Sequence, residues 1–452
     1  MGPCFIWCKK NLKWWGNSME LSVMTMVLIS LGVFFLLGMP VFMSLAISSV
    51  VALTFGGYLP MSVIHNSIFD GLNIFPLLAI PCFVIAGTLM EYGNITNQIV
   101  DVVKQMVGRM HGGLGITTIL ACTFFAAISG SGPGTVAAVG TILVPAMIRS
   151  GYSRDYAAGV SSSGGTIGLL IPPSNPMIIY SILGNVSVTA MFTAGFIPGF
   201  VVAIAMSTTA WALAKKHGFR GDENTPPFQL GSFLRSCRKS FFSLMTPLVI
   251  LGSIYSGLCT PVEAAVLAIA YALFVGIVVN RALLPIHIYK ALLEGALLCG
   301  AVLLIVGTST LFGKILTFEA APQRLAAAVM SISQNPHVVM LLIIGVLIIL
   351  GMFMETLSTI IILVPVLMPM LNLVGIDPIH FGIILVVTNE MALLTPPLGV
   401  NLFVASRIAN LSVERISIAV LPFLLALIAC ILLFTFVPEI STWLPETLGM
   451  GK

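Results

Sequence analysis

The chain has few charged residues: lysine, arginine, aspartate and glutamate make up 8% of its 452 residues, whereas 58% are hydrophobic. A soluble domain carries about 25% charged residues, so this composition excludes a soluble enzyme or binding domain. Uncharged runs such as 338–354 approach the ~20 residues that a helix needs to cross the hydrocarbon layer. The runs are continuous rather than alternating, which disfavours a membrane β-barrel. The composition predicts an all-α polytopic membrane protein.

The sequence also lacks a CxxC motif, and its eight cysteines are scattered, mostly within apolar segments. It therefore predicts neither a metal centre nor a disulfide framework. Residues 1–20 have no short apolar core followed by a small-residue cleavage site, so they do not resemble a signal peptide. We interpret 1–20 as an interfacial segment or an extension.

One hydrophilic loop divides the chain. Residues 214–240 contain six lysines and arginines but only two acidic residues, Asp222 and Glu223. The positive-inside rule places this basic linker in the cytoplasm. Its charges are interpreted as setting topology, and the net charge of +4 gives no indication of a nucleic-acid partner.

An unusual apolar pattern occurs twice, which predicts two internal repeats at 21–213 and 241–452. The offsets between the copies are 220, 224 and 225 residues. The matched segments are 142–145 with 362–365, 172–173 with 396–397, and 185–188 with 410–413. Each copy contains an apolar helix interrupted by a double proline. Paired broken helices of this kind indicate a transporter binding site, and in known cases the repeats are often inverted.

The apolar segments predict about 11 or 12 transmembrane helices. Two stretches that begin with small or polar residues and contain prolines, 129–148 and 355–371, are predicted to be re-entrant hairpins. The double prolines predict broken helices at 155–184 and 376–408.

The interruptions contain the polar groups that can bind a solute. Ser129-Gly-Ser-Gly-Pro-Gly-Thr135 and Ile171-Pro-Pro-Ser-Asn-Pro176 expose carbonyls, amides and hydroxyls in the first copy. Residues 355–359, 388–390 and 395–401 offer the same groups in the second copy. Oxygen clusters suit a hard cation such as sodium, whereas helix N-termini favour an anion such as a carboxylate. For any one segment, packing or kinking is an equally good explanation, but it accounts poorly for all of them together.

Charged residues within apolar segments are costly, at roughly 2.5 to 3.5 kcal/mol each on insertion scales. Lys314 is predicted to contact an anion and Glu355 a cation or proton. Snorkelling or a buried ion pair would explain either residue without function. Glu390, Glu263 and Arg407 are weaker candidates.

The Ser-Gly-Ser-Gly-Pro-Gly-Thr, Ile-Pro-Pro-Ser-Asn and Leu-Thr-Pro-Pro-Leu-Gly-Val-Asn motifs resemble those of the large membrane subunit of tripartite ATP-independent periplasmic (TRAP) transporters. The resemblance extends over about residues 20–450; the first residues depart from it, since that subunit would begin near Met19. Whether residues 1–18 result from a misplaced start or are the remnant of a fused small subunit stays open. It implies a sodium-coupled importer of the ion transporter superfamily in the bacterial inner membrane, not an enzyme. It further implies an elevator motion of a transport domain against a scaffold. The implied partners are a small four-helix membrane subunit and a soluble periplasmic substrate-binding protein.

The resemblance also implies where the sites lie. The residues assigned to sodium are Ser129, Ser131, Gly132, Ser174, Asn175, Thr356, Ser358, Thr395, Pro397 and Asn401. Ser129 and Ser174 are also assigned to the substrate, together with Lys314 and Glu355, which are singled out above as charges within apolar segments. Similar proteins carry C4-dicarboxylates, sialic acid, other sugar acids or organic acids, so a carboxylate is expected but not which one.

Three other functions stay open. A stand-alone sodium/anion symporter of the same superfamily would use the same architecture. An intramembrane serine protease would pair Ser129, beside a glycine-rich turn, with a base such as His380. A passive channel could also use discontinuous helices at its filter, but it would only equilibrate its solute.

Overall fold

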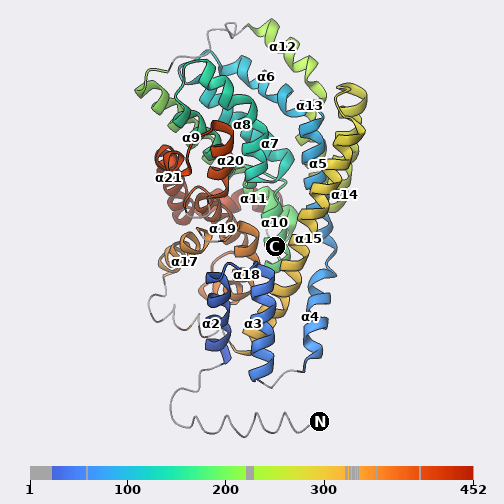
Figure 1. Ribbon diagram of the computed structural model, residues 1–452, viewed down its shortest axis with the longest axis vertical. Helices are drawn as coiled ribbons and strands as arrows, with labels where there is room; N and C mark the ends of the chain where they lie inside the picture. The colour runs from blue at the N-terminus through green and yellow to red at the C-terminus, as the bar shows by residue number, and fades with distance from the viewer. Residues whose placement is uncertain are drawn as a thin grey trace.

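The computed structural model describes residues 23–56, 60–219, 229–320, 324, 327, 331, 333, 335–352, 354–396 and 399–450. All regular structure within these ranges is helical, which confirms the predicted all-α fold (Figure 1). The predicted N-terminal segment 1–20 and the assigned sodium residue Pro397 lie outside the described residues.

Most helices begin within a few residues of the end of the preceding one. Up to the basic linker they are α2 (Val23–Leu36), α3 (Val41–Gly56), α4 (Ser62–Leu72), η2 (Phe75–Leu78), α5 (Ala79–Tyr92), α6 (Ile95–Val107), α7 (Gly113–Ser129), α8 (Gly132–Arg149), α9 (Arg154–Gly164), η3 (Gly165–Leu169), α10 (Asn175–Gly184) and α11 (Val188–Lys216). Those that follow are α12 (Leu230–Lys239), α13 (Phe241–Tyr255), α14 (Pro261–Leu273), η4 (Phe274–Val279), α15 (Pro285–Phe318), α17 (Pro336–Gly351), α18 (Thr356–Val374), α19 (Pro378–Ala392), α20 (Val400–Ala409), α21 (Val413–Phe436) and α22 (Glu439–Thr447).

Seven helical segments among the described residues are long and apolar enough to cross a membrane. They include α8, α11, α15, α18 and α21, and shorter apolar helices such as α7 and α19 accompany them. The protein is therefore a multi-pass membrane protein. The count of 11 or 12 crossings stays a prediction, because broken helices must combine to span the hydrocarbon layer.

The order of helices repeats along the chain. Helices α17, α18, α19, α20 and α21 begin 223, 224, 224, 225 and 225 residues after α7, α8, α9, α10 and α11. Both helices that contain a double proline are divided there: α9 and η3 precede α10, and α19 precedes α20. A double proline removes two backbone donors in succession, so the helix cannot continue through it.

The two predicted hairpins need a correction. Residues 129–148 do not enter and return: Ser129 ends α7, 130–131 form a turn, and 132–148 lie in the single helix α8. Likewise, Glu355 caps the single helix α18, which contains 356–371. Each hairpin consists instead of two helices, α7 with α8 and α17 with α18, and the members of each pair pack together. The prolines inside α8 and α18 do not break them, because packed neighbours can satisfy the backbone groups that a proline frees.

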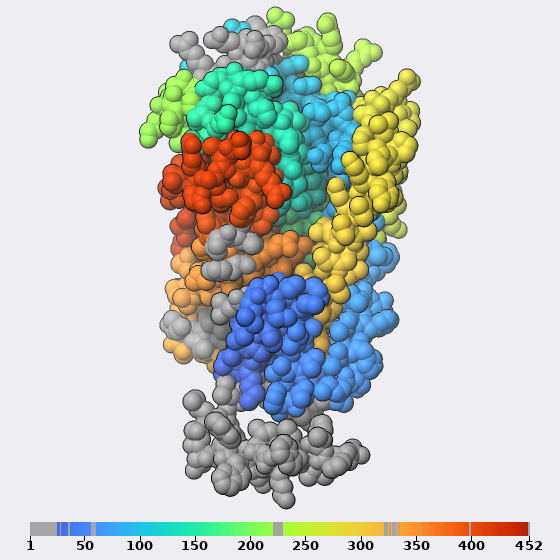
Figure 2. Space-filling view, viewed as in Figure 1, coloured from blue at the N-terminus to red at the C-terminus, as the bar shows by residue number. Residues whose placement is uncertain are grey.

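The helices pack in two groups (Figure 1). In the first group, α3, α4 and α5 pack along α15, and α14 packs against α5. In the second group, α7 to α11 pack with α19 to α21. Figure 2 shows α14 and α15 (yellow) along one side of the molecule and the orange and red helices of the second repeat along the opposite side.

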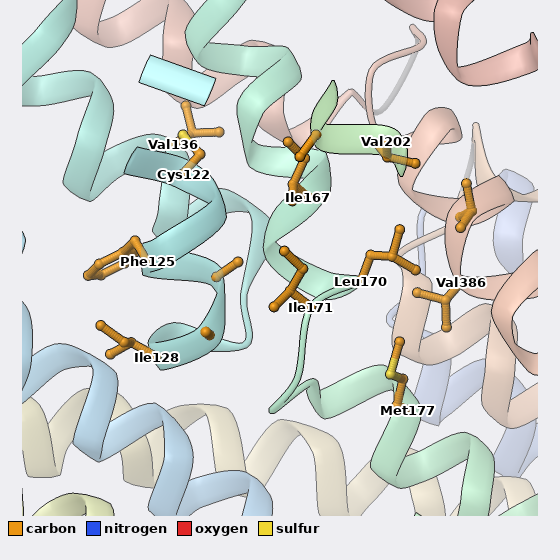
Figure 3. Close-up of a cluster of buried hydrophobic side chains, with 14 of the residues drawn as sticks. Cys122, Phe125, Ile128, Val136, Ile167, Leu170, Ile171, Met177, Val202 and Val386 are labelled. Atoms are coloured by element: carbon orange, nitrogen blue, oxygen red, sulfur yellow. The ribbon is translucent and has the colours of Figure 1, made fainter. Parts of the chain in front are cut away.

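The core of the second group surrounds the segment that leads to the first double proline. Ile167, Leu170 and Ile171 of this segment pack near Phe125 of α7 and Met177 of α10 (Figure 3). All five side chains are at most 3% exposed. Burial fixes the irregular backbone between η3 and α10, because its apolar side chains hold it between regular helices.

Candidate functional site

Four helices begin at one cavity of about 610 Å³. Gly132, Asn175, Thr356 and Val400, the first residues of α8, α10, α18 and α20, all line it. Two of these helices come from each repeat. The free N–H groups and the positive end of the dipole at a helix N-terminus favour negative charge, and here four such ends converge.

Local sequence determines where these helices begin. Ser131 and Ser174 have extended backbone and cap α8 and α10, accepting from the N–H groups of Gly134 (3.3 Å) and Met177 (3.5 Å). A proline at an early helical position follows each serine, where a missing donor costs little. In the second repeat, Glu355 and Gly399 occupy the equivalent cap positions.

The turn between α7 and α8 fits against the first double proline. Gly130 has φ +56°, and a Cβ there would lie 2.8 Å from the Pro173 carbonyl oxygen, so only glycine fits without a shift. Beside it the Ser129 and Thr135 hydroxyls are 3.0 Å apart, and Thr135 donates to the Ser131 carbonyl at 2.7 Å. The turn thus lies directly on the break in the α9–α10 segment.

A buried polar cluster lies at the joint between the repeats, behind the lining residues. The Thr356 hydroxyl donates to Glu390 Oε1 at 3.3 Å. A Cβ on Gly132 would lie 3.3 Å from Glu390 Oε2 and 3.5 Å from Asn401 Oδ1. Glu390 and Asn401 are 1% and 0% exposed. The site therefore brings the start of α8 from the first repeat against α19 and α20 of the second.

Several atoms at this site have no hydrogen-bond partner among the described residues: Glu390 Oε2, Asn175 Oδ1 and both side-chain polar atoms of Asn401. Buried polar groups are almost always hydrogen-bonded, and a set of unpaired ones needs an explanation such as a bound ion or water. Most of these atoms are oxygens, which are the ligands that a hard cation prefers.

The opposite wall of the cavity comes from α5 and α15. It includes Glu91, Thr88 and Glu294, and Thr88 donates to the Glu294 carboxylate at 3.2 Å. The described residues that line the cavity include three glutamates, with Glu355 as the third, and no lysine, arginine or histidine. An anion in this cavity would meet helix N-termini rather than a basic side chain.

The structure brings together most of the residues assigned from sequence. Those that line the cavity are Ser129, Ser131, Gly132, Asn175, Glu355 and Thr356. Ser174 is fully buried behind the wall, where its hydroxyl also donates to the Leu169 carbonyl at 2.5 Å. Ser358 is buried in the first turn of α18, whereas the Thr395 hydroxyl donates to the Met391 carbonyl.

Lys314 does not line this cavity. It is exposed on α15, 16 residues after the cavity-lining Leu298, or roughly 24 Å along the helix axis at ~1.5 Å per residue. A contact between Lys314 and an anion in this cavity would need a different arrangement of the helices.

Ser129 and His380 are not arranged as a nucleophile and its base. The Ser129 hydroxyl interacts with Thr135 and Ser131, while His380 is in the first turn of α19. His380 is ten residues from Glu390, roughly 15 Å along α19, and Glu390 is the residue of that helix beside the start of α8. The geometry gives no support to a serine protease.

Sequence reasoning underestimated Glu390 and missed Glu91, Glu294 and the serines at 161–163. Glu390 ranked below Glu355 because sequence does not reveal that the start of α8 lies against it. The three consecutive serines in α9 are fully buried, and their hydroxyls have no hydrogen-bond partner in the part of the chain that the structure describes; such a run within an apolar segment is a usable sequence signal. Glu91 and Glu294 lie 203 residues apart, and no local pattern connects them.

Comparison with known proteins identifies relatives over most of the chain. Residues 28–440 match the family described as "Tripartite ATP-independent periplasmic transporter, DctM component". The C4-dicarboxylate TRAP transporter large permease protein DctM of Rhodobacter capsulatus is 34% identical over 92% of this chain and 97% of its own length. The sialic acid TRAP transporter large permease protein SiaM of Vibrio cholerae is 36% identical over the same shares. The isethionate TRAP transporter permease protein DctMQ of Oleidesulfovibrio alaskensis is 37% identical, and this chain spans 64% of its length.

Solved structures with the same fold are also transporters. The YdaH transporter of Alcanivorax borkumensis superposes with a TM-score of 0.63 at 14% identity, covering 86% of this chain and 89% of that one. MtrF of Neisseria gonorrhoeae, from a class of antimetabolite efflux pumps, gives 0.55 at 14% identity, with 95% and 97% covered. At this identity the likeness concerns the fold alone.

Proposed function

Because the chain belongs to the DctM family of tripartite ATP-independent periplasmic transporters and is a multi-pass inner-membrane protein, we propose that it imports a small organic anion by coupling its uptake to sodium. The observation that supports this most strongly is the convergence of four helix N-termini, two from each repeat, on one cavity.

The anion is bound by backbone amides in this proposal. With no basic side chain among the described lining residues, the N–H groups at the starts of α8, α10, α18 and α20 supply the positive potential. Such a site recognises a carboxylate or a similar oxyanion by hydrogen bonds from fixed donors. It also agrees with the use of discontinuous helices for anionic groups in transporters.

Sodium binds the oxygen groups behind the amides. The fully buried Glu390 Oε2 and Asn401 Oδ1, which have no hydrogen-bond partner among the described residues, are ligands of the type that hard cations prefer. The assigned residues Ser129, Ser131, Gly132, Ser174, Asn175, Thr356, Ser358, Thr395 and Asn401 supply hydroxyl, amide and carbonyl oxygens at or next to the same break points. A cation there offsets the buried carboxylate charge, which otherwise costs several kcal/mol. Filling the cation sites is therefore expected to precede or accompany anion binding.

The substrate has at least one anionic group and a small body. Relatives are named for C4-dicarboxylates, sialic acid and isethionate, and the last of these is a sulfonate. We propose a carboxylate as the primary substrate class, with C4-dicarboxylates and sugar acids such as sialic acid as the leading members. A sulfonate presents the same oxygen geometry to the helix N-termini.

Import requires two partners and a motion. A soluble periplasmic binding protein delivers the anion, and a small four-helix membrane subunit accompanies the large one. The two packing groups of helices provide a transport domain, α7 to α11 with α19 to α21, and a scaffold around α5 and α15. Translocation is a rigid-body elevator movement of the first against the second and needs no covalent chemistry.

Uptake into proteoliposomes tests the proposal. The purified chain, with its small subunit, is supplied with carboxylates and isethionate together with their cognate binding proteins, with and without an inward sodium gradient. Accumulation that requires sodium and a binding protein is the expected result. Sodium-driven uptake without a binding protein would favour a stand-alone symporter, and equilibration indifferent to sodium would favour a channel.

A further inference from the structure

A second cavity, of about 730 Å³, lies between α7, α11 and α13, and its lining is almost wholly apolar. Phe124 of α7, Phe200 and Ile204 of α11, and Leu248 of α13 line it. These four side chains are 42%, 54%, 65% and 62% exposed. The cavity is thus an open groove on the outer surface of helices that face the hydrocarbon layer.

The groove separates the two packing groups of helices. α7 and α11 belong to the second packing group, which contains three of the four converging N-termini (α8, α10 and α20), whereas α13 packs mainly with α14 and less extensively with α6 and α7. At one end of the groove the Phe196 and Tyr255 rings are 5.8 Å apart, so the two walls touch there. The groove is therefore a cleft with one wall on each group.

The dimensions suit an extended hydrocarbon chain. The lining residues of α11 run from Phe196 to Thr208, which is 12 residues or roughly 18 Å at ~1.5 Å per residue. This is just over half the ~30 Å hydrocarbon thickness, or about one leaflet.

One end of the groove leads to a basic and aromatic pair. Trp211 and Lys215 follow Thr208 by one and two turns on the same helix, and the Lys215 ammonium lies 5.1 Å from the centre of the Trp211 ring. Tryptophan and lysine in this arrangement mark the level of the lipid head groups. The positive-inside rule places this end on the cytoplasmic side, where anionic lipids attract lysine.

We propose that the groove binds one acyl chain of an anionic phospholipid of the inner leaflet, with its head group beside Lys215. A protein segment bound there would contact both packing groups and hold them together. A single acyl chain fills the cleft and still allows its two walls to move past each other. This last point rests on the proposed elevator motion; the binding site itself does not. The site is built from van der Waals contact along the cleft and one charge pair at its end.

Photolabelling in nanodiscs tests this site without any transport measurement. The chain is reconstituted with phosphatidylglycerol that has a diazirine in one acyl chain, irradiated, digested and analysed by mass spectrometry. Labels are expected on groove residues such as Leu120, Phe200 and Leu251, in excess of labels on the exposed lipid-facing residues Ile349 and Leu432. Equal labelling of both sets would mean that only ordinary boundary lipid contacts the groove, and would overturn the proposal.

A groove-filling variant provides the matched control. Gly252 lines the groove, and a Cβ built on it has no atom within 4 Å, so Gly252→Phe places a ring in the groove without a backbone clash. Labelling of Phe200 should fall at least about tenfold, because a close-packed cleft cannot hold both the ring and a chain. Gly300→Phe, at an exposed glycine of α15 with equally open space, should leave labelling unchanged. Thermal melting of both variants shows that the fold persists, and undiminished labelling of a folded Gly252→Phe variant would refute the site.

Lysine substitutions test the head-group contact separately. Lys215→Gln should lower the preference of groove labelling for phosphatidylglycerol over phosphatidylcholine by about fivefold, the contribution of one lysine near an anionic surface. Lys290→Gln, at an exposed lysine of α15, should leave the preference unchanged. A preference unaffected by Lys215→Gln would overturn the head-group assignment, and crosslinks to a copurified protein instead of lipid would identify the groove as a protein interface.

Discussion

The Thr356 hydroxyl donates a hydrogen bond to the Glu390 carboxylate at 3.3 Å, and this bond joins the first turn of α18 to the end of α19. Within the described part of the chain the other oxygen of Glu390 has no hydrogen-bond partner, and it lies near the start of α8, where a Cβ on Gly132 would be 3.3 Å away. One buried carboxylate therefore lies where three helices from both repeats meet. Any shift of the α17–α18 or α7–α8 pair changes its surroundings.

Replacing Glu390 tests its role as a cation ligand. Glu390→Gln keeps the shape and the Thr356 contact but removes the charge. The sodium concentration for half-maximal uptake should rise about tenfold or more, since a contact with a charged group contributes ~1.5 to 3 kcal/mol. Glu446→Gln, at an exposed glutamate of α22, is the control and should behave as the unmodified chain. Unaltered sodium dependence in a folded Glu390→Gln variant would remove this residue from the cation site.

Asn175 and Asn401 are expected to contribute neutral ligands. Asn175→Ala or Asn401→Ala removes a side-chain oxygen that has no hydrogen-bond partner among the residues described, so half-saturating sodium should rise roughly twofold to tenfold, the range for a neutral hydrogen-bonding group. Sodium titrations of uptake measure this, with detergent-solubilised melting as the fold check. Asn372→Ala, at an exposed position of α18, serves as the comparison. Two unchanged titration curves would exclude both residues as sodium ligands.

Gly130 tests the fit of the α7–α8 turn against the first double proline. Gly130→Ala meets two penalties: left-handed backbone, ~1 to 2 kcal/mol for a non-glycine residue, and a Cβ 2.8 Å from the Pro173 carbonyl oxygen. Gly151→Ala meets only the first, because nothing lies within 4 Å of its Cβ. Uptake should fall much more in Gly130→Ala than in Gly151→Ala, measured at equal expression. Equal losses of uptake in the two variants would show that the close approach to the Pro173 carbonyl oxygen does not affect transport.

Lys314 distinguishes the cavity described above from the sequence-based assignment. Since Lys314 is exposed and far along α15, Lys314→Ala should change the substrate concentration for half-maximal uptake by less than about twofold, as is usual for exposed surface charges. Transport assays over a substrate range measure this at saturating sodium. A large selective loss of substrate affinity would instead support the assignment of Lys314 to the anion.

The break points could be read from sequence because proline acts locally. Pro173 and Pro396 each end a helical segment by removing a donor, whatever the surroundings. The run from Ser129 likewise marks a turn. The sequence does not indicate which neighbouring helix forms the other arm of the hairpin, so it places each hairpin within α8 or α18 alone. In the structure each hairpin consists of two helices, α7 with α8 and α17 with α18. Glu390 and Lys314 show the same limit: the cost of burying a charge is evident from sequence, but the groups around it come from distant segments.

The four helices that begin at the cavity start at equivalent positions in the two repeats, but their N-cap residues differ. Ser131 and Ser174 begin the helices of the first copy, whereas Glu355 and Gly399 occupy these places in the second. In a homodimer, one gene would impose the same residue on both halves of the cavity. Fusion into a single chain removes that constraint, so each half can mutate independently while the backbone frame is kept. Changes in specificity within such a lineage can therefore arise from substitutions at one cap without any loss of the fold.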